Sequence, residues 1–278
     1  MTDEKQLRVV GNRFADAVGP GGGPIRDRCM CFDQYGRKHP HEVAFHAEQQ
    51  DETAQGWLHL LELVDEAAAD GREVFKPLAE LSPSERLQIV TLPASIARLT
   101  RVKHLILYGS NMVRLPPEIG AMTSLEEFDP YTSHRLHWFP YELTRCSRLR
   151  DSTVSTRSIY GNFKTRPPFP RLRASAEVGD LDLGDLDPGV WGARAVRACS
   201  VCDRPITGEI HQRWISLQVA TDVLPLLVNA CSPACAGSLP PGARNHVHSA
   251  HTGGPDVEQP PSGRGKRPAP GPRPDAGS

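Results

Sequence analysis

Hydrophobic residues recur at a regular spacing in the middle of the chain. The segments LPASIARLTRVKHLIL, LPPEIGAMTSLEEFDP and FPYELTRCSRLRDSTV align at a period of 23 and then 24 residues. Each aligned column is apolar in all three copies: Ile89, Met112 and Leu136; Leu92, Leu115 and Phe139; Ile96, Ile119 and Leu143; Leu99, Met122 and Cys146; Val102, Leu125 and Leu149. A unit of this size cannot bury its apolar edge alone, so the pattern predicts stacked repeats that share a core.

The pattern resembles the leucine-rich repeat family, in its 23-residue LPxxIxxLxxLxxLxL form, from residue 87 to about 158. The resemblance implies an α/β fold, with a short curved solenoid over residues 87–175 and one parallel strand per repeat on the concave face. It also implies that side chains between the strand leucines face a partner: Lys103, His104, Ile106, Tyr108, Glu126, Glu127, Asp129, Tyr131, Arg150, Asp151, Thr153 and Ser155. Charge mixed with tyrosine suits a polar protein interface. The alternative is that these are ordinary solvated strand positions.

The repeats depart from the family pattern at two places. The asparagine that forms a ladder in the family is replaced by Ser110, Ser133 and Arg157, although Asn111 lies one position late. Pro130 occupies a strand position where the family has leucine. Because proline cannot donate a hydrogen bond to a strand ladder, we expect the second repeat to be irregular.

Helical signals precede the repeats. Residues 53–70 carry apolar side chains at helical spacing, and Ser82-Pro83-Ser84-Glu85 has the pattern of a capping box with proline at the first helical position. We therefore expect residues 25–86 to be a helical region that caps one end of the solenoid. Residues 1–24 end in GPGGGP and are predicted to be a disordered arm.

Four cysteines form the strongest candidate site. Cys199-x2-Cys202 and Cys231-x3-Cys235 are separated by 28 residues that contain two apolar, strand-like runs, WISLQV and LPLLVNA. A hairpin built from these runs would bring the pairs together, and the residues after Cys231 suit a helix start. The arrangement resembles a treble-clef zinc finger over residues 195–240, which implies structural Zn²⁺ in a closed shell of four thiolates. Incidental thiol pairs or a redox CxxC motif are the alternatives.

Other cysteines and histidines give weaker signals. Cys29 and Cys31 with His39 and His41 could form a second metal site, and a loop with spare thiols is the alternative. HEVAFH differs from the zincin motif HExxH because its histidines are five residues apart, so we expect no catalysis there. His134 and His137 are expected at the surface or rim of the repeats, and Cys146 as a buried small hydrophobe.

Charge and composition describe the rest of the chain. The formal net charge of −1 does not indicate a dedicated nucleic-acid binder. Residues 145–173 are locally basic and contain three aromatic side chains, and an acidic linker is expected over residues 176–194. Residues 241–278 are rich in glycine and proline and nearly lack large apolar side chains. Their composition predicts a disordered tail.

These observations predict a non-enzymatic scaffold that binds an unidentified protein through the repeats. The alternative is a nucleic-acid-associated protein that uses residues 145–173 and the zinc module. No nucleophile, base and orienting group can be assembled from the spacing, so we expect no catalytic residues. The chain shows neither a signal peptide nor an apolar run long enough for a membrane span, which favours the cytoplasm and no membrane partner.

Overall fold

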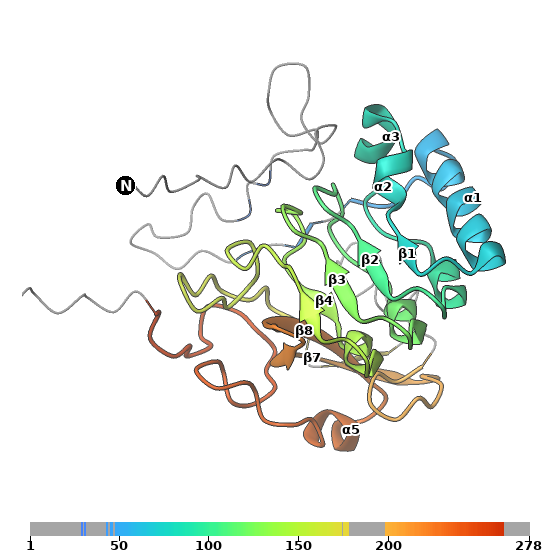
Figure 1. Ribbon diagram of the computed structural model, residues 1–278. Coiled ribbons are helices and arrows are strands. Elements are labelled where there is room, and N and C mark those ends of the chain that lie inside the picture. Colours follow the sequence, from blue (N-terminus) through green and yellow to red (C-terminus); the bar gives the residue numbers. More distant parts are fainter. Residues whose placement is uncertain are drawn as a thin grey trace, which may run out of the picture.

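The computed structural model describes residues 29, 31, 43, 45–46, 48–173, 175–177 and 198–263 (Figure 1). These residues form a mixed α/β fold with two four-stranded sheets, in the orders β1-β2-β3-β5 and β4-β8-β7-β6. The predicted α/β class is therefore confirmed. Within the described ranges, each helix is too short or too polar to cross a bilayer.

The first sheet is parallel, and its strand spacing follows the sequence period. Its strands are short: β1 (Val74–Phe75), β2 (His104–Ile106), β3 (Glu127–Asp129) and β5 (Asp151–Ser152). β2 pairs with β3 through His104 opposite Glu127, 23 residues later in the chain, and β3 pairs with β5 through Glu127 opposite Asp151. Equivalent positions of successive repeats are therefore neighbours in the sheet.

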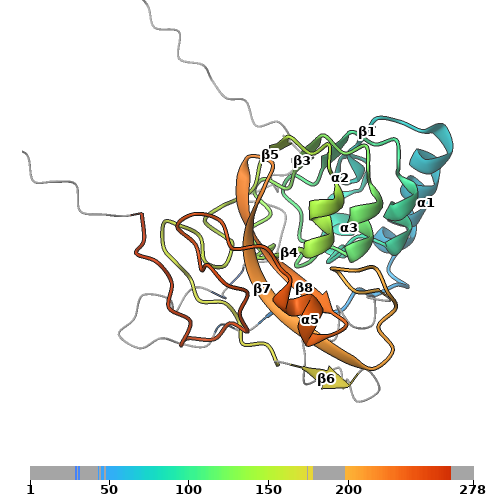
Figure 2. The same ribbon diagram turned by 90° about the horizontal axis from the view of Figure 1, so that it is seen from below.

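A turn of 3-10 helix follows each Leu-Pro or Phe-Pro pair, on the opposite side of the repeats from the first sheet (Figure 2). These turns are η2 (Ala94–Arg98), η3 (Pro117–Ala121) and η4 (Tyr141–Arg145). Pro93, Pro116 and Pro140 precede the turns with extended backbone, a conformation that the ring favours. The turns contact one another in sequence order, so they stack in step with the strands.

The aligned apolar columns form the core between the strands and the turns. Leu92, Leu115 and Phe139 are buried, as are Ile96, Ile119 and Leu143. Two serines replace the ladder asparagine: Ser110 donates from its backbone N–H and its hydroxyl to Ser133 Oγ, which donates to the Leu107 carbonyl. A hydroxyl network therefore satisfies the turn that follows β2.

Three helices lie at one end of the first sheet: α1 (Gln55–Asp70), α2 (Pro77–Glu80) and α3 (Pro83–Leu87) (Figure 1). α1 buries Trp57, Leu60 and Val64 against the repeats and ends at Gly71, whose φ of 67° is left-handed. The capping box predicted at Ser82 and Glu85 is present at α3. Both predicted helices are confirmed, and β1 adds a strand that the pattern did not predict.

A long hairpin lies at the other end of the repeats (Figure 2). β7 (Glu209–Val219) and β8 (Asp222–Ala230) are antiparallel, β4 (Phe139–Pro140) pairs with β8, and β6 (Ala176–Glu177) pairs with β7. At the tip of the hairpin, the Thr221 hydroxyl accepts from the Ser152 N–H at 3.0 Å. The hairpin and the repeats share one hydrophobic core, whereas the sequence predicted a solenoid ending at residue 175 and a separate module at 195–240.

A second, smaller core is rich in aromatic side chains and borders the third repeat. Its buried members come from separate stretches of chain: Val43, Trp138, Tyr160, Phe169, Leu172, Trp214 and Leu227. Trp214 is fully buried at its centre, donates from Nε1 to the Pro170 carbonyl at 2.9 Å and stacks on Phe45 with 5.6 Å between ring centroids.

Residues 241–263 pack beside this aromatic core. His251 exchanges two backbone hydrogen bonds with Trp214, and Gly254 donates to the Phe169 carbonyl. Gly253 has a φ of +72°, and a Cβ there would lie 2.0 Å from the Pro170 carbonyl oxygen, so close backbone contact requires glycine. The predicted disordered tail is therefore wrong for residues 241–263. Residues 264–278, the arm 1–24 and the acidic residues 178–194 lie outside the described ranges.

Candidate metal centre and binding face

The four predicted zinc ligands meet at the base of the hairpin. Cys199 and Cys202 lie in the turn before β7, Cys231 follows β8 directly, and Cys235 lies on α5 (Pro233–Gly237). Ser232 caps α5 by accepting the Cys235 N–H. All four sulfur atoms lie within 4.8 Å of one another. The hairpin and the helix start were therefore predicted correctly, and they position the four thiols.

The sulfur geometry matches the size of a tetrahedral metal site. Cys231 Sγ lies 3.6 Å from Cys202 Sγ and 3.7 Å from Cys235 Sγ. Bonds of about 2.3 Å from one zinc ion would separate tetrahedral sulfurs by about 3.8 Å. None of these cysteines is in a disulfide. The four thiols can therefore hold one metal ion and leave no open coordination position for substrate.

Backbone and side-chain donors surround the sulfur atoms. Cys199 Sγ accepts the N–H groups of Val201 and Cys231, and Cys202 Sγ accepts from Arg204 Nε at 3.5 Å. The Arg204 guanidinium lowers the pKa of Cys202 to about 6, whereas burial and the neighbouring sulfurs raise the pKa of Cys231 to about 12. Several thiolates at this distance repel one another, so full deprotonation needs a cation among them.

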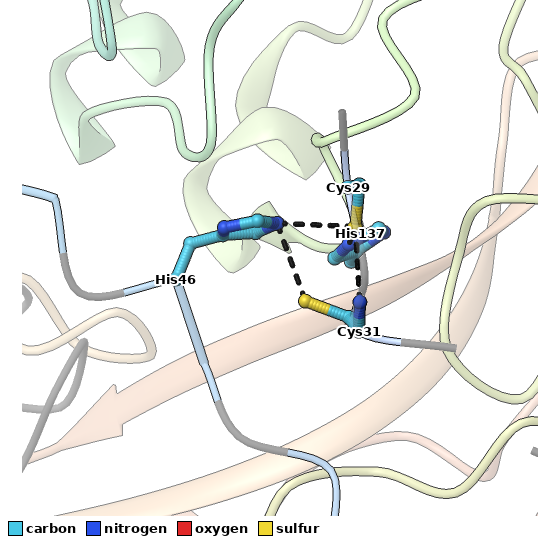
Figure 3. A group of neighbouring side chains, drawn as sticks. All are labelled: Cys29, Cys31, His46 and His137. Carbon is cyan, nitrogen blue, oxygen red and sulfur yellow. Dashed lines mark hydrogen bonds between the residues drawn. The ribbon is translucent and has the colours of Figure 1, made fainter. Parts of the chain in front are cut away.

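A second cluster joins Cys29 and Cys31 to His46 and His137, with all four ligand atoms within 4.8 Å (Figure 3). His39 and His41, the predicted partners of these cysteines, lie outside the described residues. His137 was predicted at the surface or rim, and this is wrong because it is 1% exposed. Cys29 and His137 are 108 residues apart in the chain, so no short motif could have indicated their contact.

The predicted partner-facing positions follow the strands of the first sheet. Tyr131 is 45% exposed, and its ring centroid lies 6.0 Å from that of the half-buried Tyr108. Charged side chains at or just before the starts of the strands are linked across neighbouring strands: Lys103 with Glu73 at 2.5 Å, Glu126 with Arg150 at 2.6 Å and His104 with Glu127 at 3.5 Å. The predicted face thus carries charge pairs at the strand starts and an aromatic pair in the turns after β2 and β3.

Two of the predicted partner-facing positions, Asp129 and Ser155, are buried, so the prediction is wrong for them. Asp129 is 5% exposed and accepts the Tyr131 N–H through Oδ1 at 3.1 Å, so it shapes the turn instead of facing a partner. Pro130 follows β3 directly, and Thr132 then adopts a positive φ of 62°. Gly109, the equivalent position of the first repeat, has a φ of 69°, so the two repeats share this turn and the irregularity expected in the second repeat is not seen in it.

Several basic and aromatic side chains of segment 145–173 have partners inside the molecule. Arg145 pairs with Asp203 at 2.5 Å, and Arg171 pairs with Asp256 at 2.8 Å. Arg166 is buried and donates to the carbonyls of Gly161 and Asn245. Of the three aromatic rings in the segment, Tyr160 and Phe169 are buried, and Phe163 is exposed. Two of the aromatic rings are therefore not available to stack on bases.

Comparisons of the chain with protein-family models, curated proteins and solved structures find no match.

Proposed function

We propose that the chain is a non-enzymatic scaffold of leucine-rich-repeat type that binds another protein through the exposed face of β2, β3 and β5. The observation that carries the proposal is the Tyr108–Tyr131 pair, which lies in the turns that follow β2 and β3 of the stacked repeats. Tyrosine on a rigid surface gives a large contact area at a small entropic cost, and it is enriched at interaction sites.

The charge pairs at the strand starts suit one edge of such an interface. Lys103, Glu126 and Arg150 are paired with neighbours and keep exposed or half-buried side chains. Their pairing orders the side chains before a partner arrives, which reduces the entropy lost on binding. Aromatic anchors combined with polar side chains are the usual division between affinity and specificity at protein interfaces.

In this proposal, the Cys199–Cys235 cluster holds Zn²⁺ with a structural role. Four thiolates close the coordination shell, and tetrahedral sulfur ligation favours zinc over the common oxygen-seeking cations. Because β8 of the same hairpin pairs with β4 of the third repeat, the ion would stabilise the end of the repeat stack.

The nucleic-acid alternative has weaker support. It relied on the basic and aromatic residues of segment 145–173, and several of these form internal pairs or lie in the core. Phosphate binding by Arg145 or Arg171 would require breaking an ion pair, which lowers the net gain of that contact. The protein-binding proposal needs no such rearrangement.

Photo-crosslinking with the intact chain tests the proposed face. A photoreactive amino acid at residue 131 is expected to capture a discrete protein from the native extract, and capture should fall at least about tenfold when Tyr108→Ala removes the neighbouring ring, as for an interface hot spot. The matched control carries the photoreactive residue at Phe163, which is 46% exposed and lies on another surface. Equal capture from residues 131 and 163, or none from 131, would contradict the proposal.

A further inference from the structure

Four potential metal ligands converge where the N-terminal segment meets the third repeat (Figure 3). His137 Nε2 lies 3.1 Å from Cys29 Sγ, and His46 Nε2 lies 3.4 Å from Cys29 Sγ and 3.3 Å from Cys31 Sγ. One tetrahedral zinc ion, with bonds of about 2.3 Å to sulfur and about 2.0 Å to nitrogen, would separate sulfur from nitrogen by about 3.5 Å. The three distances are close to this value and slightly shorter.

Hydrogen bonds at the far side of each ring orient both histidines toward the sulfurs. His137 Nδ1 contacts the Ser158 carbonyl oxygen, which can only accept, so this nitrogen carries the proton. The lone pair of neutral His137 is therefore on Nε2, the atom that faces Cys29. A carbonyl or carboxylate behind the ring is the usual support of a histidine that binds a metal.

His46 has the corresponding arrangement. Its Nδ1 lies 3.3 Å from the Glu48 carboxylate, an acceptor, and its Nε2 faces both sulfurs. Arg135 also lies 3.5 Å from this Nδ1, but its guanidinium is bound to the same Glu48 carboxylate and to Asn111 Oδ1. The carboxylate therefore decides the tautomer and leaves the lone pair of His46 on Nε2.

We propose that Cys29, Cys31, His46 and His137 bind a second Zn²⁺ ion, which fastens the N-terminal segment to the third repeat. Two sulfur and two imidazole ligands form a closed tetrahedral set, so the role is structural. The proposal does not depend on the partner-binding face or on the metal at Cys199–Cys235. Binding releases the two thiol protons to solvent, and the ion replaces them.

The contacts around His46 show what a metal ion at this cluster would add to the attachment of the N-terminal segment. The chain beside His46 is held to the repeats by polar contacts: Glu48 accepts from Arg114 and Arg135, and Gln50 pairs with Val90 and Gln88 at 2.9 Å. Phe45 and Cys31 pack against the aromatic core. A metal at the cluster would add Cys29 and Cys31 to this attachment, so the segment, the repeats and the aromatic core would be joined at one point.

Metal analysis of the full chain tests the proposal. After purification and dialysis, the wild-type protein is expected to carry about two zinc ions per chain. Cys29→Ser with Cys31→Ser should reduce this to about one, and Cys202→Ser with Cys235→Ser should independently reduce it to about one. Cys146→Ala is the matched control because it removes a thiol that belongs to neither cluster. It should keep both ions.

A second measurement covers the case in which a variant does not fold. Alkylation of the wild-type chain, mapped by mass spectrometry, should leave Cys29 and Cys31 unmodified in the presence of zinc and label both after chelation. Loss of zinc from the second cluster alone should also increase proteolytic cleavage within residues 29–50. At most one zinc ion per chain, with Cys29 and Cys31 alkylated at the same rate before and after chelation, would overturn the proposal. That result would leave a metal-free thiol–imidazole pair, whether or not the first cluster holds zinc.

Discussion

The larger core collects side chains from equivalent positions of successive repeats, whereas the aromatic core collects them from segments that share no repeat position. In the larger core, Leu92, Leu115 and Phe139 stack at one period. In the aromatic core, Trp138, Tyr160, Phe169 and Trp214 come from separate segments that meet only in the folded chain. A periodic core can be predicted from a sequence, and a core of this second kind requires the tertiary structure.

The two cysteine clusters follow the same division. Cys199 and Cys235 belong to the larger core, and the turn, hairpin and short helix that position the four thiols are adjacent in the sequence. The cluster of Cys29, Cys31, His46 and His137 lies beside the aromatic core, and its ligands come from three separated segments. The first cluster, with its local ligands, should therefore control the stability of the larger core. The second cluster, with its long-range ligands, should control the attachment of the N-terminal segment to the repeats.

Loss of the first cluster should have the largest effect. Cys202→Ser is expected to lower the free energy of unfolding by more than about 4 kcal/mol, because binding energy at a structural metal site is also folding energy. Cys202 is only half-buried, so little packing is lost with its sulfur. Thermal unfolding should show a fall of more than about 10 °C, and Cys29→Ser should give a smaller fall.

The residues that exchange faster in Cys202→Ser also test whether the hairpin and the repeats share one core. Since β4 pairs with β8, hydrogen exchange in Cys202→Ser should increase beyond residues 195–240, in β4 and η4, and remain slow in α1 and β2. Exchange confined to residues 195–240 would mean that the hairpin is an independent module. That outcome would restore the separate domains that the sequence suggested.

Truncation should act on the aromatic core. Deleting residues 243–278 removes the backbone partners of Trp214, Phe169 and Leu172, and each buried group left unpaired costs about 1–3 kcal/mol. We expect a loss of at least about 3 kcal/mol, measured by urea unfolding. Deleting residues 264–278 is the control and should change stability by less than about 0.5 kcal/mol. Equal stability of the two truncated chains would show that residues 243–263 do not support the core.

Much of the fold could be predicted from the sequence because its signals are local. The helix Gln55–Asp70, the capping box at Ser82, the hairpin and the four thiols all depend on spacings within one segment. The repeat period predicted which residues lie in the larger core, and Cys146 is buried in its column as expected.

The remaining features depend on long-range contacts. His137 has no metal motif around it and gains its cysteine neighbours only through tertiary packing. Residues 241–263 have few apolar side chains, and composition alone predicted disorder. Their order comes instead from backbone hydrogen bonds to Trp214, Phe169 and Leu172, which composition does not reveal. Asp129 was predicted to face a partner because the strand alternation does not account for the turn at Pro130.

The smallest expected effect is a pH dependence that reports on the edge of the aromatic core. The ring of His251 packs edge-on against Phe169 at 4.7 Å, and its Nδ1 accepts the Gly253 N–H at 3.0 Å. Burial lowers the pKa of His251 from 6.5 to about 4. The unfolded chain therefore binds this proton more tightly than the folded chain, so the contribution of His251 to stability is present above pH 6.5 and is lost as the pH falls toward 4. Between about pH 7.5 and about pH 5 the loss should be about 2 kcal/mol.

His251→Asn keeps a hydrogen-bond acceptor and removes the titration, so its urea-unfolding free energy should fall less steeply over this range. Any metal release in acid would act on both proteins, and the difference between the two curves isolates His251. Parallel curves would mean that the ring is protonated in the folded state, and that the segment opens from the aromatic core before the protein unfolds.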